Sequence, residues 1–204
     1  MEAERVVVDI VKQRLELLSH GDLGGAVYFL YEEAKKFKDK DWALELGVGP
    51  GRSTEAILWG IKESNSNARL FSVDYKPCSD ARERIKQLGL NCYHVFVRED
   101  DRNVLKIIRG IQMFLGKGFS PAARFVFIDS SHEYEHTVTE LFSYSWLTNQ
   151  IFLHDTERVE VKAAIDLFLR CSKMNEWKYK ERGWRHGFAI LTRVKPLGEG
   201  VMIK

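Results

Sequence analysis

The order of apolar and polar positions divides the chain into a helical beginning and a longer part of mixed period. Before residue 41, apolar residues recur at spacings of three and four on both sides of the break HGDLGG. This spacing predicts two amphipathic helices, which we expect to form an N-terminal helical cap, residues 1–40, belonging to the same domain as the rest. The first series is Val6, Val7, Ile10, Val11 and Leu15, and the second is Val27, Leu30, Tyr31 and Ala34.

From residue 41 onward, short apolar runs alternate with segments of helical period. The runs predict strands at 42–48, 69–74, 92–97, 124–129 and 151–154. The segments between them predict helices at 53–63, 79–88, 102–115, 135–146 and 159–171. Such alternation is typical of βαβ units, in which a parallel sheet is covered by helices on both faces.

The end of the chain has a different pattern. EWKYKERGW, the turn RHG and FAILTRV predict two strands joined by a tight connection. We therefore expect an α/β domain over residues 41–204 with a Rossmann-like, doubly wound, seven-stranded sheet. It should be mostly parallel, with an antiparallel C-terminal hairpin, and preceded by the two N-terminal helices. Ligands of such sheets bind at the carboxyl ends of the strands, near the switch in strand order.

Composition narrows the choice of partners. The chain has 204 residues, 45% of them apolar, which suits one domain, and 31 basic against 29 acidic residues leave a net charge of +2. This balance predicts no general attraction to nucleic acid or to an anionic membrane. The acidic N-terminus and the lack of an apolar run of about 18 to 20 residues favour a cytoplasmic protein. Cys78, Cys92 and Cys171 are too few and too widely spaced for a disulfide framework or a cysteine zinc site.

A glycine-rich segment, ALELGVGPGRS, follows the first predicted strand. Glycines allow positive φ and let backbone N–H groups approach a ligand, and Ser53 is placed to cap the next helix. The alternative is a glycine turn that binds nothing. The dinucleotide motif GxGxxG would need a third glycine where Arg52 stands, so NAD is disfavoured. The candidate ligand-binding residues are Glu45, Gly47, Gly49, Gly51 and Ser53.

The second predicted strand, LFSVD, ends in Asp74, whose carboxylate could accept hydrogen bonds from both hydroxyls of a ribose. With this residue the chain resembles the class I S-adenosylmethionine-dependent methyltransferases, of the methyltransferase domain 24 type. Their ExGxGxG loop corresponds to the glycine-rich segment and their ribose-binding acid to Asp74. The resemblance covers roughly residues 41–194 and implies that the cofactor is S-adenosylmethionine.

The resemblance also implies an adenine contact after the third strand, where the sequence reads REDDRN. Glu99, Asp100 and Asp101 are the candidates, and we take Asp100 as the cofactor-binding residue. The alternative is that this charged run is only the solvated start of a helix.

Two acidic residues end the fourth and fifth predicted strands, FVFID and IFLHD. Asp129 and Asp155 should lie close enough to share one hard divalent cation. The string IDSSHEYEHTVTEL followed by HD is similar to a branch related to the magnesium-dependent small-molecule O-methyltransferases, in which the corresponding aspartates bind Mg²⁺. This chain departs from that branch at Ser130, Ser131 and Thr156 and lacks its PGG turn. Without a metal, the resemblance places Asp129 near the methionine end of the cofactor.

The same region contains HEYEH, a match to the zinc-protease signature HExxH. The longer metzincin continuation fails, since Thr139 and Phe142 stand where glycine and the third histidine are needed. If a helix begins near Glu133, His132 lies in the strand-end loop and His136 a turn further along, so the two need not converge. We therefore predict that HEYEH is not a protease site, and that His132 is a catalytic base. A structural histidine at the start of the helix is the alternative.

The expected function is transfer of a methyl group from S-adenosylmethionine to an oxygen of a small molecule, assisted by Mg²⁺ at Asp129 and Asp155 or by His132 alone. Asp129 and His132 are the predicted catalytic residues. Methylation of RNA or protein is an alternative, because KMNEWKYKERGWRHG mixes basic and aromatic side chains. A zinc protease and a cofactor-binding protein without catalysis are alternatives of other classes. The expected partner is a small-molecule acceptor, without nucleic acid or membrane, and a homodimer stays open.

Overall fold

The computed structural model describes residues 2–116, 119–120, 122–172 and 176–197, with side chains from residue 9 onward. Two helices come first, α1 (Glu2–Ser19) and α2 (Ala26–Ala34). The elements that follow are β1 (Trp42–Leu46), α3 (Arg52–Glu63), β2 (Arg69–Asp74), α4 (Ser79–Gln87), β3 (His94–Arg98), α5 (Val104–Leu115), β4 (Val126–Ile128), α6 (Tyr134–Tyr144), β5 (Gln150–His154), α7 (Val159–Cys171), β6 (Trp177–Arg182) and β7 (Phe188–Arg193).

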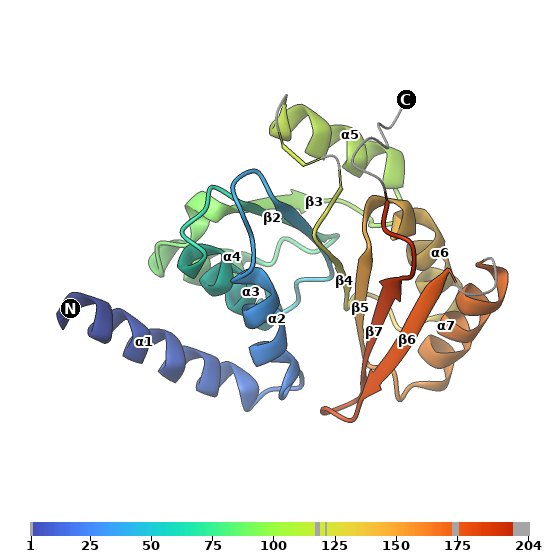
Figure 1. Ribbon diagram of the computed structural model, residues 1–204, viewed down its shortest axis with the longest axis horizontal. Helices are drawn as coiled ribbons and strands as arrows, with labels where there is room; N and C mark the ends of the chain where they lie inside the picture. Colours follow the sequence, from blue (N-terminus) through green and yellow to red (C-terminus); the bar gives the residue numbers. More distant parts are fainter. Residues whose placement is uncertain (1, 117–118, 121, 173–175, 198–204) are drawn as a thin grey trace.

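The strands form one seven-stranded sheet in the order β3-β2-β1-β4-β5-β7-β6 (Figure 1). β1 to β5 pair in parallel, whereas β7 runs antiparallel to both β5 and β6. The predicted fold, a mostly parallel sheet closed by an antiparallel hairpin and preceded by two helices, is confirmed. The order reverses between β1 and β4, and such a switch point is where open α/β sheets bind their ligands.

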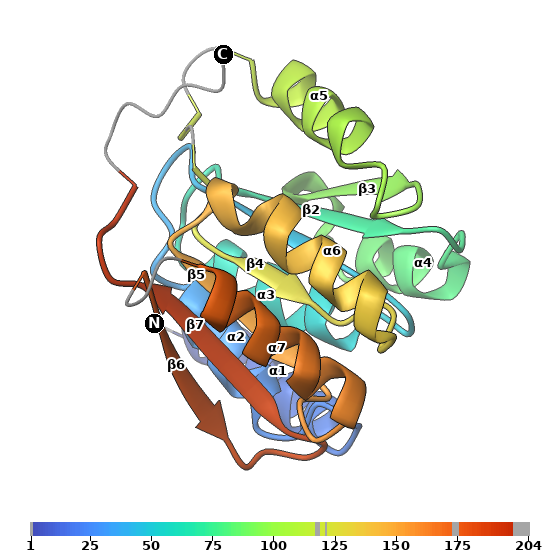
Figure 2. The same ribbon diagram turned by 90° about the vertical axis from the view of Figure 1, so that its right-hand side faces the viewer.

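Helices cover both faces of the sheet, so the central strands are apolar on both sides. Successive side chains of β4 point to opposite faces of the sheet. Phe127 packs with α1, α2 and α3, whereas Val126 and Ile128 pack with α5, α6 and α7. Figure 2 shows α6 and α7 in front of the sheet, with α2 and α3 behind it. Continuous apolar runs, rather than strictly alternating ones, are expected of parallel strands buried in this way.

The two N-terminal helices share the core of the sheet domain. Val11 and Leu15 of α1 are buried with the residues of α2 and α3. Arg14 donates two hydrogen bonds, of 2.8 and 2.9 Å, to the carboxylate of Glu55, which is fully buried in α3. Arg84 of α4 donates a third, of 3.0 Å, so one buried carboxylate ties α1, α3 and α4 together.

Several predicted boundaries were wrong by two or more residues. β3 begins at His94 because residues 91–93 close a 3-10 turn, in which Tyr93 N donates to Leu90 O. α5 begins at Val104 because Asn103 N donates to Asp100 O in a turn before the helix. β4 is only three residues long, and α6 ends at Tyr144, where residues 145–147 form another 3-10 turn. In the part of the chain that the structure describes, no helix has the length and apolar character to span a bilayer.

Candidate active site

A cavity of about 790 Å³ opens at the carboxyl ends of the parallel strands, next to the switch point. Its walls come from the loops after β1 to β5 and from the first turns of α6 and α7. Of the residues predicted from the sequence, Gly47, Gly49, Asp74, Asp100, Asp129 and His132 line it. Glu45, Gly51, Ser53 and Asp155 are not among its lining residues.

Gly47 sets the loop after β1 against the end of β4. Its φ is +90°, and a Cβ at this position would lie 2.1 Å from the carbonyl oxygen of Asp129. A side chain is therefore excluded both by backbone conformation and by space. Gly49 has a φ of +49° and nothing within 4 Å of a built Cβ, so its open side faces the cavity. The two glycines thus have different roles. Gly47 lets the loop pack closely on the end of β4, and Gly49 leaves the backbone open to a ligand in the cavity.

Glu45 lies beneath this loop and is fully buried. Its carboxylate accepts hydrogen bonds from Ser53 Oγ at 2.6 Å, Thr54 Oγ1 at 2.8 Å and Ser72 Oγ at 2.6 Å. Burial raises the pKa of Glu45 to about 7, against the opposing effect of these hydrogen bonds. Glu45 therefore joins β1, β2 and the start of α3 and holds the loop in place from below.

The prediction that Ser53 caps α3 was wrong. The helix begins at Arg52, and the cap residue is Gly51 in the left-handed conformation, with φ of +75°. Ser53 lies inside the first turn, and its hydroxyl is turned inward to Glu45 because that buried carboxylate needs donors.

Asp74 organises the same loop from the side of β2. Its Oδ2 accepts from the backbone N–H of Val48 at 3.0 Å and of Gly49 at 3.1 Å, and its Oδ1 accepts from Lys76 N at 2.8 Å. Burial alone would raise the pKa of Asp74, but the three backbone donors, together with the thiol of Cys78, outweigh it and hold the pKa below its ordinary value. Asp74 is therefore ionised at the edge of the cavity, with one of its roughly four acceptor positions left over.

The loop after β3 brings two aspartates to the cavity wall. Asp100 pairs with Arg102, Nη2 to Oδ2 2.6 Å, and this pairing lowers the pKa of Asp100 to about 2. Asp101 is buried, and its Oδ1 lies 2.6 Å from His136 Nε2 of α6. Glu99, the third candidate, pairs with Lys106 and is not a lining residue.

The ends of β4 and β5 carry a group of four side chains, Asp129, His132, His154 and Asp155, which we call the strand-end cluster. His132 Nε2 lies 2.6 Å from Asp155 Oδ2 and 3.8 Å from Asp129 Oδ1. The pairing with Asp129 and Asp155 raises the pKa of His132 to about 9. The ring is therefore held as a cation between the two carboxylates at neutral pH.

His154 completes the strand-end cluster from behind, where it is buried. Its Nδ1 lies 3.2 Å from Asp129 Oδ1, and its Nε2 lies 3.2 Å from the carbonyl oxygen of Arg185 in the turn between β6 and β7. Burial would lower the pKa of His154, but the two aspartates raise it above the ordinary value. Ligand atoms of Asp129, His154 and Asp155 all lie within 4.8 Å of one another, a spacing that fits one divalent cation.

The histidines of HEYEH contact different acids. α6 begins at Tyr134 with Glu133 as its cap residue, as predicted, and leaves His132 in the strand-end loop. His132 pairs with Asp155, whereas His136 pairs with Asp101 on the other side of the cavity. The two rings thus belong to separate groups.

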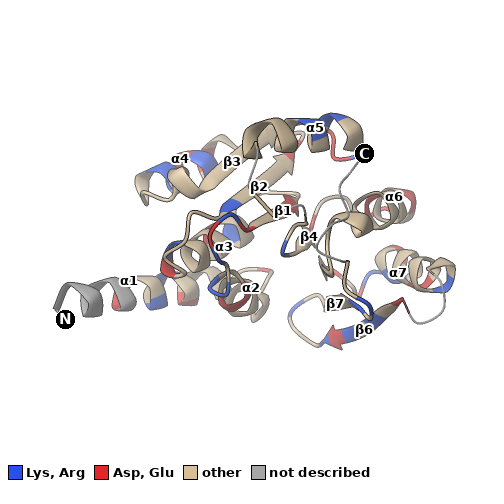
Figure 3. Cartoon of the chain, turned by 45° about the horizontal axis from the view of Figure 1, so that its top comes forward, with Lys and Arg blue, Asp and Glu red and all other residues tan. Residues whose placement is uncertain are grey.

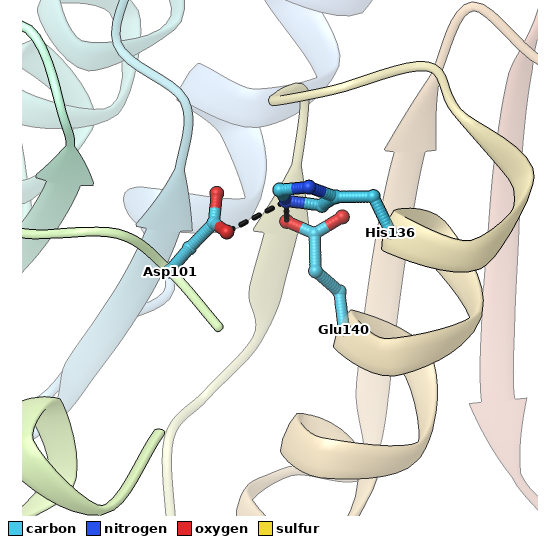
Figure 4. Close-up of side chains that lie close together, drawn as sticks. All are labelled: Asp101, His136 and Glu140. Carbon is cyan, nitrogen blue, oxygen red and sulfur yellow. Dashed lines mark hydrogen bonds and ion pairs between the residues drawn. The ribbon is translucent and has the colours of Figure 1, made fainter. Parts of the chain in front are cut away.

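Sequence reasoning missed a second group at the cavity, Asp101, His136 and Glu140, which we call the loop-helix cluster (Figure 4). Glu140 is fully buried, and burial raises its pKa well above the ordinary value. Its Oε1 accepts a hydrogen bond of 2.6 Å from Ser130 Oγ. The four-residue spacing of His136 and Glu140 was visible in the sequence, but the approach of Asp101 depends on the fold.

Comparison with known proteins agrees with this geometry. The family model described as Methyltransferase domain matches residues 44–150, more than half of the chain. A methyltransferase from Podospora anserina bound to S-adenosylhomocysteine has 15% identity and a TM-score of 0.63, over 95% of this chain and 96% of that one. An O-methyltransferase from Bacillus cereus in complex with S-adenosylhomocysteine has 14% identity and a TM-score of 0.63, over 95% and 97%.

A third solved structure, from Clostridium thermocellum and described as an rRNA methylase, has 15% identity and a TM-score of 0.62, over 87% of this chain and 98% of that one. No curated protein is similar enough to the chain to count as a match.

The sheet order, the glycine loop at the switch point and the acid after β2 define a class I S-adenosylmethionine-dependent methyltransferase. Both the Podospora anserina and the Bacillus cereus proteins hold S-adenosylhomocysteine, the demethylated cofactor of that class. Within that class, the chain belongs to the methyltransferase domain family whose model spans residues 44–150.

Proposed function

We propose that the enzyme methylates an oxygen of a small hydroxylated molecule, bound beside the strand-end cluster. The observation that carries this proposal is that one continuous cavity reaches from the glycine loop to Asp129 and His132. Its volume of about 790 Å³ lies within the range of roughly 300–1,000 Å³ usual for small-molecule sites. Cofactor and acceptor would share this space. The similarity in fold to the O-methyltransferase of Bacillus cereus gives further support.

The reaction is a displacement at the methyl carbon. The acceptor oxygen forms a bond to that carbon, the carbon–sulfur bond breaks, and its electron pair stays on sulfur as S-adenosylhomocysteine. The sulfonium already supplies the activation, so the protein mainly has to align three atoms and take the acceptor's proton. The glycine loop and Asp74 would hold the cofactor, and Asp100 remains our candidate for the adenine contact.

His132 is the proposed base, and its surroundings set a condition on that role. With a pKa of about 9, only about one ring in a hundred is neutral at pH 7 and able to accept a proton. The carboxylates of Asp129 and Asp155 also offer oxygen ligands for a hard divalent cation, which would orient the acceptor hydroxyl and lower its pKa. We therefore keep Mg²⁺ or a similar ion as part of the proposal, held by Asp129 and Asp155.

Methyl transfer to a panel of catechols, phenols and hydroxy acids tests the proposal, measured as S-adenosylhomocysteine formed. His132→Ala should lower the rate by roughly 10²–10⁴-fold if His132 is the base. Chelation with EDTA followed by dialysis should abolish turnover and leave cofactor binding intact. Activity that survives this treatment would remove the metal from the proposal and leave His132 acting alone. Cofactor binding without transfer to any hydroxyl would favour a non-catalytic binding protein.

RNA methylation is the weaker candidate because two residues of the basic and aromatic C-terminal segment, Trp184 and Arg185, contact other parts of the fold. Trp184 packs on Phe29 and Phe188, and Arg185 donates to the carbonyl oxygens of His20 and Gly21. The first residues of that segment, 173–175, lie outside the described residues. Figure 3 places acidic as well as basic residues along β6 and the helices beside it, a mixture that does not favour a phosphate backbone.

A further inference from the structure

The loop-helix cluster brings three potential metal ligands together beside the cavity. Asp101 comes from the loop after β3, and His136 and Glu140 stand one turn apart on α6, with their side chains directed toward one another (Figure 4). His136 Nε2 lies 2.6 Å from Asp101 Oδ1 and 3.9 Å from Glu140 Oε1. One ligand atom from each residue falls within a common span of 4.8 Å, which a single ion could bridge.

Glu140 gives a second, independent reason to expect a ligand at this cluster. Its side chain is fully buried, and within the described part of the chain its Oε2 has no hydrogen-bond partner. Ser130 satisfies only Oε1. A buried carboxylate oxygen without a partner is costly, and native structures rarely keep one unless something binds there.

The cluster also has few basic partners. Two carboxyl groups, of which burial favours the protonated form of Glu140, face one imidazole, and among the described residues no lysine or arginine forms an ion pair with Asp101 or Glu140. The nearest arginine in the chain, Arg102, is engaged by Asp100 instead. A divalent ion would replace the proton of Glu140 and balance both carboxylates.

We propose that Asp101, His136 and Glu140 bind a divalent transition-metal ion such as Zn²⁺. The mixture of one imidazole nitrogen with two carboxylates suits Zn²⁺ or its first-row neighbours better than Mg²⁺ or Ca²⁺, which prefer oxygen alone. Asp101 and His136 line the cavity whereas Glu140 does not, so a fourth coordination position would face the cavity. The ion would join the loop after β3 to α6.

This site is distinct from the strand-end cluster, since the two groups share no residue. It does not depend on the identity of the methyl acceptor or on the metal proposed for that cluster. The two sites can therefore be separated by substitution, one group at a time.

The test is Zn²⁺ titration of chelator-stripped protein by calorimetry, together with thermal unfolding with and without Zn²⁺. Glu140→Gln keeps the shape of the side chain and an acceptor for Ser130, but removes the charge. It should weaken this site by more than about 100-fold, because loss of even an outer-shell partner of a metal ligand costs roughly 10–100-fold. The Zn²⁺-induced rise in melting temperature should disappear with it.

Two control variants make the result specific. Glu135→Gln changes an exposed acid on the same helix, and Asp155→Asn changes the strand-end cluster; both should keep the site and its thermal shift. Asp101→Asn supplies a second test at the opposite ligand, and decides the matter if Glu140→Gln does not fold. Equal Zn²⁺ binding in Glu140→Gln, Asp101→Asn and the parent protein would overturn the proposal. So would a zinc site lost only in Asp155→Asn, or a parent protein that binds no Zn²⁺.

Discussion

Asp74 is the residue at which cofactor binding can be tested most sharply. Its carboxylate already accepts three backbone N–H groups, from Val48, Gly49 and Lys76. A carboxylate offers about four acceptor positions, so without rearrangement it has room for about one ribose hydroxyl rather than two. The binding energy at stake is therefore about one hydrogen bond to a charged group, roughly 1.5–3 kcal/mol.

Asp74→Asn should raise the dissociation constant of S-adenosylhomocysteine by about 10–150-fold, the equivalent of that energy. The amide NH₂ cannot accept a hydrogen bond, so at least one backbone N–H also loses its acceptor. The free energy of unfolding of the unliganded protein should fall by about 1–3 kcal/mol as well. Calorimetric titration measures the first quantity and urea unfolding the second.

A change on the ligand side separates a ribose contact from damage to the loop. The 2′-deoxy and 3′-deoxy analogues of S-adenosylhomocysteine are each titrated into the parent protein and into Asp74→Asn. In the parent protein, one analogue should bind more weakly than S-adenosylhomocysteine does. In Asp74→Asn, the same analogue should bind as tightly as S-adenosylhomocysteine does. Asp80→Asn, an exposed acid at the start of α4, should behave like the parent. The reasoning is refuted if Asp74→Asn binds as tightly as the parent, or if both analogues lose affinity equally in both proteins.

Two further predictions concern the loop itself. Gly47→Ala should lower the free energy of unfolding by roughly 2–6 kcal/mol, the sum of positive-φ strain and overpacking against Asp129. Gly110→Ala, in the open interior of α5, should instead raise the free energy of unfolding by up to about 1 kcal/mol. Urea unfolding measures both variants, and a similar loss of stability in the two would contradict this prediction. Glu45 has a pKa of about 7 in the folded protein, above its usual 4.5, so the folded state binds the extra proton and stability falls as pH rises from about 4.5 through 7. Relative to Glu45→Gln, the free energy of unfolding of the parent should fall by on the order of 3 kcal/mol between pH 4.5 and 7. If the free energies of unfolding of the two proteins depend on pH in the same way, the pKa shift is disproved.

The fold and the cofactor class were predictable from the sequence because both depend on local patterns. Alternating apolar runs and helical periods are enough to predict a doubly wound sheet, and the chain order of strands predicts where their carboxyl ends lie. The glycines of ALELGVGPGRS indicate a backbone that needs positive φ, and this can be recognised without coordinates. Asp74 can be recognised in the same way, from its place at the end of the second predicted strand. Element boundaries were less accurate, since hydrogen bonds in turns, such as Asn103 N to Asp100 O, decided them.

Only the tertiary structure decided how the polar side chains combine. Ser53 looked like a helix cap, but burial of Glu45 drew its hydroxyl inward. The sequence placed Asp129 and Asp155 at neighbouring strand ends, yet it could not foresee that His132 lies between them as a cation. Asp101 and Glu140, 39 positions apart, meet at His136 because α6 packs beside the loop after β3. Such contacts depend on the packing of elements distant in sequence, and packing is a property that no local pattern encodes.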